Sequence, residues 1–232
     1  MSLIRCESLS LSYEGHSVVS DLNFSVEEGN YLCILGENGS GKTTLMKALL
    51  GLKAPAKGKI LYDEGLTRKD IGYLPQRTAV SKDFPASVRE IVLSGCAGHA
   101  GLRPFYTKEE KECAERNMER LSVRDLENRC FRELSGGQQQ RVLLTRALCA
   151  ARRMLFLDEP AASLDSAVTK ELYKVTETLN RDENMTVVMI SHDLSSAMTC
   201  ASHILHIGSF VFFGTREEYR RRLEETGEDS HV

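Results

Sequence analysis

The alternation of apolar and polar side chains predicts strands near the start of the chain. Residues 3–11 and 18–26 alternate with a period of two, and residues 31–35 form a short apolar run that ends at Gly36. A helical period follows over residues 43–50. The first 50 residues therefore predict two half-buried strands, one buried strand and a helix.

From about residue 85 to residue 150 the period becomes helical. Helices are predicted over residues 87–93, 108–121 and 138–150, with no strand between them, which indicates an inserted helical lobe. Beyond it, strands alternate with helices. The predicted strands are 154–157, 186–190, 204–207 and 210–213, and the predicted helices are 167–179 and 194–200.

Strands that alternate with helices of this length predict an α/β fold with a mainly parallel sheet covered by helices. We expect one domain over residues 1–232, with a core of residues 1–84 and 151–232 and a helical subdomain of residues 85–150. In such sheets ligands bind at the carboxyl ends of the strands.

Composition and charge indicate which partners and which cellular location to expect. The formal net charge of −3 disfavours binding to nucleic acid, and we expect no nucleic-acid partner. No apolar run reaches the length of a membrane-spanning helix, and the first residues lack the pattern of a signal peptide, so we expect a cytoplasmic protein. Seven cysteines without a Cys-x-x-Cys pair are interpreted as reduced core residues.

A phosphate-binding loop is predicted between the buried strand and the first helix. The segment Gly36-Glu37-Asn38-Gly39-Ser40-Gly41-Lys42-Thr43 fits G-x-x-x-x-G-K-[ST]. Its backbone N–H groups and the helix N-terminus are expected to bind the phosphates of ATP. Lys42 is expected to contact the β and γ phosphates, and the Thr43 hydroxyl to coordinate Mg²⁺. With the next residue, Thr44, this loop is the predicted ATP-binding segment.

Two acidic residues follow the apolar run of residues 154–157. Asp158 ends this run and is the candidate second carboxylate of a magnesium site. Glu159 follows directly, where a carboxylate can polarise a water molecule aimed at the γ-phosphate. Such a pair is also common where a strand simply ends, and the phosphate-binding loop makes the catalytic interpretation the favoured one.

A glycine pair opens the helix before these acids. The segment Leu134-Ser135-Gly136-Gly137-Gln138, followed by Gln139-Gln140-Arg141, resembles the signature of ATP-binding cassette (ABC) ATPases. Together with the two preceding motifs, the resemblance covers essentially the whole chain. It implies a P-loop cassette with an N-terminal antiparallel β part, an inserted helical subdomain, and ATP hydrolysis with Mg²⁺.

The resemblance implies roles for further residues. Tyr13 matches the aromatic residue that stacks on adenine, although it also fits a half-buried tyrosine in a strand. Gln76 matches the Q-loop glutamine, a ligand of Mg²⁺, and Asp165 belongs to a D-loop. His192 resembles the switch histidine that contacts the γ-phosphate. The implied catalytic residues are then Lys42, Glu159 and His192.

The resemblance also implies an assembly. Two cassettes, as a homodimer or a pair in an ABC complex, pack head to tail, and each ATP lies between the P-loop of one and the signature segment of the other. The implied partners are integral-membrane permease subunits and, indirectly, an extracytoplasmic metal-binding protein. The protein would then lie on the inner face of the cell membrane.

The segment of residues 83–95 resembles that of subunits serving zinc and manganese permeases. Phe84, Pro85, Ser87 and Val88 are the predicted permease contacts. Iron-siderophore and haem importers carry a related run, and an amphipathic helix without substrate information also fits. A soluble ABC ATPase of translation or DNA repair is a weaker alternative, because one cassette without sustained heptads does not match those classes.

Two further features are interpreted as structural. His203 and His206 lie three residues apart in a predicted strand, so their rings point to opposite faces and do not form a metal site. The arginines at 216 and 220–222, interspersed with glutamates, predict a solvated terminal helix.

Overall fold

The computed structural model describes residues 1–13, 16–76, 85–101, 103–162 and 164–226. These residues form two compact units. The first contains Met1–Arg68 and the residues from Asn180 onward, and the second contains Lys69–Leu179. The predicted helical segment of residues 85–150 lies entirely within the second unit.

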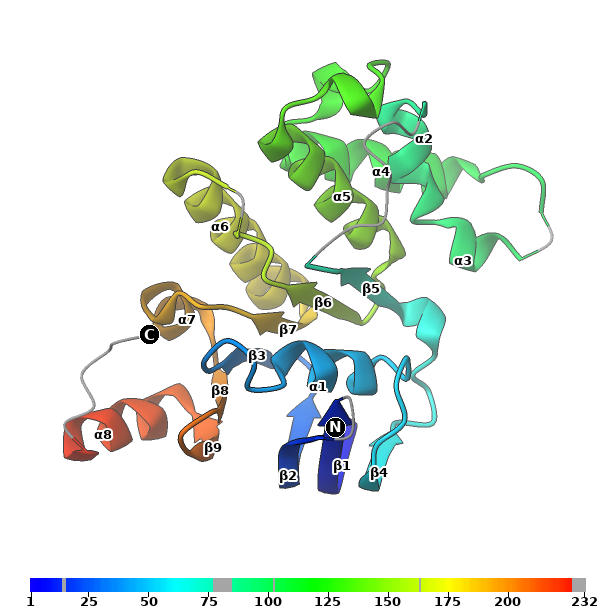
Figure 1. Ribbon diagram of the computed structural model, residues 1–232. Helices are drawn as coiled ribbons and strands as arrows, with labels where there is room; N and C mark the ends of the chain where they lie inside the picture. Colours follow the sequence, from blue (N-terminus) through cyan, green and yellow to red (C-terminus); the bar gives the residue numbers. More distant parts are fainter. Residues whose placement is uncertain (14–15, 77–84, 102, 163, 227–232) are drawn as a thin grey trace. The chain divides into compact units, whose positions relative to one another are not determined.

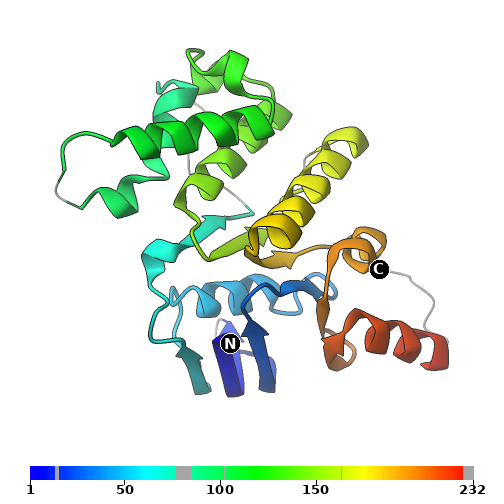
Figure 2. The same cartoon turned by 180° about the vertical axis from the view of Figure 1, so that it is seen from behind.

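The first unit begins with a three-stranded antiparallel sheet. Strand β1 (Ser2–Tyr13) lies between β2 (His16–Glu27) and β4 (Lys57–Tyr62), and the three strands stand side by side in both ribbon views (Figures 1 and 2). Cys6 of β1 pairs with Phe24 on one side and with Ile60 on the other. Most of the apolar positions of β1 and β2 are buried, which explains their alternating pattern.

The same unit contains a parallel group of strands. Strand β3 (Tyr31–Leu35) pairs with β7 (Thr186–Ile190) and β8 (His203–Ile207), and β9 (Val211–Thr215) pairs antiparallel with β8. Every residue of β3 and β7 is buried. The helices of this unit are α1 (Lys42–Leu49), α7 (Leu194–Cys200) and α8 (Arg216–Thr226).

The second unit combines a short parallel strand pair with a helical lobe. Strand β5 (Ile71–Leu74) pairs with β6 (Met154–Asp158). The lobe contains α2 (Val88–Ser94), α3 (Ala97–Ala100), α4 (Lys108–Arg120) and α5 (Gly136–Ala150), and α5 packs against α2 and α4 (Figure 1). Helix α6 (Ser166–Glu183) begins in this unit. Single turns of 3₁₀ helix lie at Arg68–Asp70, Arg124–Leu126 and Phe131–Glu133.

Helix α5 packs closely on β5 because Gly72 has no side chain. A Cβ atom built on Gly72 would lie 2.1 Å from the carbonyl oxygen of Ala147 in α5. Any larger residue would push the helix off the strand.

The α/β class predicted from the sequence is confirmed, with a mostly parallel arrangement of strands flanked by helices and an added antiparallel sheet. Strands β3 and β7 and helix α7 have the predicted bounds, and the terminal helix is present as α8. Two strands, β4 and β5, were not predicted. In β4 most side chains are exposed, and β5 has four residues including a glycine, so neither carries a readable apolar pattern.

Candidate functional site

The phosphate-binding loop joins β3 to α1 in the first unit. Gly36 has a φ of 138°, and a Cβ atom at this position would lie 1.8 Å from the carbonyl oxygen of Ile207 at the end of β8. Only glycine fits such a start to the loop. Lys42 is 5% exposed, and its Nζ donates hydrogen bonds of 2.7 Å to the carbonyl oxygens of Gly36 and Glu37, so the ammonium group lies across the loop.

Three further features of the loop fit a phosphate ligand. The hydroxyl oxygen of Ser40 is buried and has no hydrogen-bond partner among the residues that the structure describes. An unsatisfied buried hydroxyl is costly, and a bound anion would satisfy it. A Cβ atom built on Gly39 meets nothing within 4 Å, so the space beside the loop is open. The N-terminus of α1 adds its partial positive charge.

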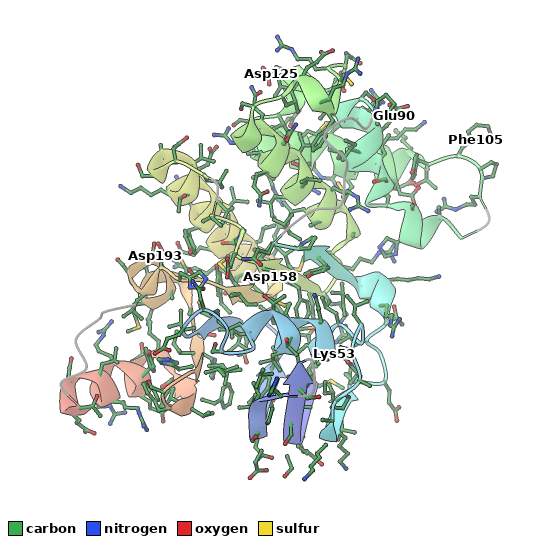
Figure 3. The ribbon with its side chains drawn as sticks, viewed as in Figure 1. Lys53, Glu90, Phe105, Asp125, Asp158 and Asp193 are labelled. Carbon is green, nitrogen blue, oxygen red and sulfur yellow. The ribbon has the colours of Figure 1, made fainter. Side chains whose placement is uncertain are left out.

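His192 lies at the same edge of the parallel strands as this loop. It follows β7, which pairs with β3 so that Ile190 is opposite Ile34. The backbone N–H of Ser191 donates to the carbonyl oxygen of Ile34 at 3.2 Å. The Asp193 side chain accepts from the Ser196 N–H and caps α7, which fixes the turn that carries His192. Figure 3 labels Asp193 at this turn.

The two candidate carboxylates follow β6 in the second unit. Asp158 is 1% exposed at the end of this strand, where Figure 3 labels it. Burial and, second, the charge of Asp158 raise the pKa of Tyr73 on the neighbouring strand β5 to about 12. Glu159 follows with a φ of 50°, and its Oε2 accepts a 2.5 Å hydrogen bond from Gln76 Nε2. The structure therefore joins two residues that the sequence placed 83 positions apart.

The signature segment forms the N-terminus of α5. Leu134 is buried and anchors the segment, and the Ser135 side chain accepts from the Gln138 N–H while Gln138 Oε1 accepts from the Ser135 N–H. This capping box explains the local serine and glutamine without any ligand. Gly136 and Gly137 have no side chain over the helix end, and a Cβ atom on Gly136 would meet nothing within 4 Å.

Helix α5 is also fastened to the segment that follows Glu159. Gln140 Nε2 donates to the carbonyl oxygen of Pro160 at 3.0 Å, and Arg141 pairs with Glu171 of α6 at 3.1 Å. Asp165 Oδ1 accepts from the N–H groups of Ala167 and Val168 and so caps α6. No role was predicted for Gln140 or Arg141, although both belong to the quoted signature run.

The predicted permease contacts are described only in part. Phe84 and the side chain of Tyr13, the candidate adenine contact, lie outside the described residues. Ser87 caps α2 and exchanges hydrogen bonds with Glu90, and these bonds lower the pKa of the Glu90 carboxyl. Val88 is fully buried, so its side chain packs inside the lobe and is not available to a partner in this structure, whereas Pro85 is exposed.

The two strand histidines have structural partners, as predicted. His203 stacks on Phe213, and the ring of buried His206 shares a 2.8 Å hydrogen bond between Nδ1 and the Tyr219 hydroxyl. Within the described ranges no group of three or more His, Cys, Asp or Glu residues is arranged to hold a metal ion. No helix of the described chain is long and apolar enough to cross a membrane.

The sequence matches a family model described as "ABC transporter" over residues 19–162. The chain belongs to the ABC transporter family. A zinc uptake system ATP-binding protein, ZurA of Listeria innocua serovar 6a, is 35% identical over 230 residues, which are 96% of this chain and 90% of ZurA. The manganese transport system ATP-binding protein MntB of Bacillus subtilis (strain 168) is 35% identical over 223 residues, covering 93% and 88%.

A solved structure gives the same result for the fold of this ABC protein. A transporter assigned to the metal-chelate type, in an inward-facing conformation, superposes with a TM-score of 0.84 at 31% identity, covering 94% of this chain and 85% of that one. As a member of this family the chain is an ATP-binding cassette that hydrolyses ATP.

Proposed function

We propose that the chain is the ATP-hydrolysing subunit of an ABC importer for a divalent metal ion, zinc or manganese. The observation that carries the proposal is that relatives matching about nine-tenths of their length are named for zinc uptake and manganese transport.

The residues fit ATP with Mg²⁺. Residues 36–44 hold the phosphates. Lys42, whose Nζ donates to two carbonyl oxygens of the loop, supplies a positive charge, and the buried Ser40 hydroxyl supplies a further donor. Thr43, Gln76 and Asp158 offer a hydroxyl, an amide oxygen and a carboxylate, which are the hard oxygen ligands that Mg²⁺ prefers. The ion supplies neutralisation of the charge that develops on the phosphate oxygens.

Hydrolysis then depends on positioning and electrostatics. Glu159 orients and polarises the attacking water, and its 2.5 Å contact with Gln76 holds the carboxylate in one orientation beforehand. His192 contacts the γ-phosphate from the turn after β7. Tyr13 stacks on adenine.

A second cassette completes each site in this proposal. The N-terminus of α5, from Leu134 to Gln138, binds the γ-phosphate held by the partner's P-loop, because its open glycines expose a helix end that favours an anion. Asp165 lies in the segment that crosses to that partner. Residues 85–150 act as the subdomain that meets the permease, with contacts made by Pro85 and Ser87 and by Phe84, the last residue before the subdomain. The protein works on the inner face of the membrane.

The experiment that tests the function compares metal content in cells dependent on this protein with cells carrying Glu159→Gln, under chelator-imposed metal limitation. The substitution should lower ATP turnover about a hundredfold or more, because the general base is lost. Elemental mass spectrometry should then show a selective fall in zinc or in manganese, and the element that falls names the cargo.

Unchanged zinc and manganese, with the variant expressed and defective in hydrolysis, would reject the metal proposal and leave the ATPase standing. An iron-siderophore or haem importer is then the alternative. Turnover within a few-fold of the wild type would reject the role of Glu159 itself.

A further inference from the structure

Three of the seven cysteines meet inside the helical lobe, where the ATPase function uses none of them. Cys96 lies between α2 and α3, Cys113 on α4 and Cys149 in the last turn of α5. The Cys149 sulfur shares one amide donor with the Cys113 sulfur, and the Cys96 thiol donates to the Cys149 carbonyl oxygen at 3.8 Å. Helices α4 and α5 run side by side in both ribbon views (Figures 1 and 2), so the contact joins two long elements of the lobe.

A buried amide holds two of the sulfur atoms together. The Asn117 side chain is 6% exposed, and its Nδ2 lies 3.5 Å from the Cys113 sulfur and 3.6 Å from the Cys149 sulfur. An amide nitrogen has two N–H donors, so it can serve both sulfurs at once. Donors aimed at a sulfur stabilise its thiolate form.

The surroundings distinguish the three thiols. The hydrogen bond from Cys149 lowers the pKa of Cys113, and the charges of Arg116 and Arg120 lower it further. Contact with the Cys113 and Cys96 thiols, and after it burial, raises the pKa of Cys149. Cys96 also has a lowered pKa through Cys149, but it is only 2% exposed, whereas Cys113 is partly exposed. The accessible nucleophile of the cluster is therefore Cys113.

We propose that Cys113 and Cys149 form a redox site that reacts with hydroperoxides and closes to a disulfide between α4 and α5. A metal site is the other use of clustered thiols, but no group of three such ligands within the described ranges has a geometry that holds a metal ion. The proposed chemistry needs only two sulfur atoms close to each other, and the Asn117 amide nitrogen lies within 3.6 Å of both.

The reaction has two steps. The Cys113 thiolate attacks the terminal oxygen of the hydroperoxide: a sulfur electron pair forms the S–O bond, and the O–O bond breaks with its electron pair on the departing oxygen. That oxygen takes up a proton and leaves as water or an alcohol. The Cys149 sulfur then attacks the Cys113 sulfenic acid. An S–S bond forms, the S–O bond breaks, and the Cys149 proton leaves with the hydroxyl as water. Two thiols thus reduce one hydroperoxide.

Burial of Cys149 beside the reactive sulfur has a chemical consequence. A sulfenic acid without a resolving thiol is oxidised further to sulfinic acid, which thiols do not reverse. With Cys149 in place the reaction stops at the disulfide, which a dithiol reductant reopens.

The experiment treats the purified full-length protein with graded hydrogen peroxide, alkylates the remaining thiols and maps them by mass spectrometry. The wild type should lose two of its seven free thiols, with a Cys113–Cys149 link that dithiothreitol removes. Cys113 should react at least about tenfold faster than Cys130, a partly exposed cysteine outside the cluster.

Three variants separate the site from general oxidation. Cys149→Ala should yield sulfinic acid at Cys113 and no disulfide, Cys113→Ser should leave Cys149 reduced, and Cys130→Ser should behave as the wild type. Circular dichroism of each variant before oxidation checks that it is folded, and Cys113→Ser, at a partly exposed position, carries the test if Cys149→Ala unfolds. Equal rates at Cys113 and Cys130, or a link from Cys113 to Cys96, would overturn the proposal.

Discussion

Glu159 combines its predicted chemistry with an unfavourable backbone conformation. Its φ of 50° lies in the left-handed region, which costs a residue with a Cβ atom about 1 kcal/mol or more. The same residue holds the 2.5 Å contact with Gln76. A strained backbone at a residue with a reactive carboxylate lowers the stability of the protein, and it is explained by a role of that residue in activity.

Of two substitutions of Glu159, the less conservative one should therefore give the more stable protein. Glu159→Gly should unfold with about 1 kcal/mol more free energy than Glu159→Gln, because glycine relieves the left-handed strain. Both should lack turnover. Urea unfolding measures the difference, and at Glu112, inside α4, the same pair of substitutions should rank in the reverse order. Equal ranks at both positions would show that φ is not the cause.

Single residues were predicted best where a motif fixes the backbone locally. The loop from Gly36 to Thr43, the glycine pair that opens α5 and the two acids at the end of β6 lie in the elements that the sequence indicated. The contacts of Gln76 with Glu159 and of Asn117 with two cysteines could not be predicted, because they join segments that only the packing of helices and strands brings together. The periodicity of apolar residues predicts which face of a helix or strand is buried, but it does not predict which residues of other elements pack against that face.

At the scale of elements, two helices of the lobe begin with reciprocal serine or threonine and glutamate caps. In α4 the Thr107 side chain accepts from the Glu110 N–H, and Glu110 Oε2 accepts from the Thr107 N–H at 2.7 Å. Arg103 adds a 2.8 Å ion pair to the same carboxylate. These partners, the Thr107 N–H first, lower the pKa of Glu110. The sequence pattern of α4 was readable because its cap and its period agree.

We expect Glu110→Gln to destabilise the lobe at neutral pH and to have little effect in acid. A carboxyl whose pKa is lower in the folded protein contributes stability above its unfolded pKa, near 4.3, and loses it as the pH falls through the folded value. The cost at pH 7 should be about 0.5–1 kcal/mol, since the group is partly exposed. Urea unfolding at pH 7 and pH 3 checks this, and Glu112→Gln on the same helix is the control. A loss that persists at pH 3 would contradict it.

Strands were harder to predict than helices where packing is one-sided. Strand β4 has no fully buried side chain, and it exists because β1 offers a free edge for pairing. Strand β5 is four residues long and includes Gly72, whose missing side chain lets α5 approach. Each of these strands forms because of the element that it contacts, β1 for β4 and α5 for β5. Neither strand could therefore be recognised from its own residues.

At the scale of the whole molecule, the candidate residues are divided between the two units. Lys42 and His192 belong to the first unit, and Glu159, Gln76 and Ser135 belong to the second. In the proposed function each ATP needs a P-loop from one protein chain and a signature segment from another. Neither motif alone then forms a working ATP site. A chain with a defective P-loop and a chain with a defective signature segment should therefore form one intact site when they pair.

Mixing two inactive variants tests that arrangement. In a head-to-tail pair of Lys42→Ala and Ser135→Arg chains, both defects fall on one ATP site, and the other site has an intact Lys42 and an intact Ser135. If chains pair at random, half of the pairs are mixed and each has one working site of two, so an equal mixture should recover about a quarter of wild-type turnover. Steady-state phosphate release from each variant alone sets the background. A mixture no more active than the two variants measured separately would mean that the signature segment serves the ATP of its own chain, and the proposed pairing would be wrong.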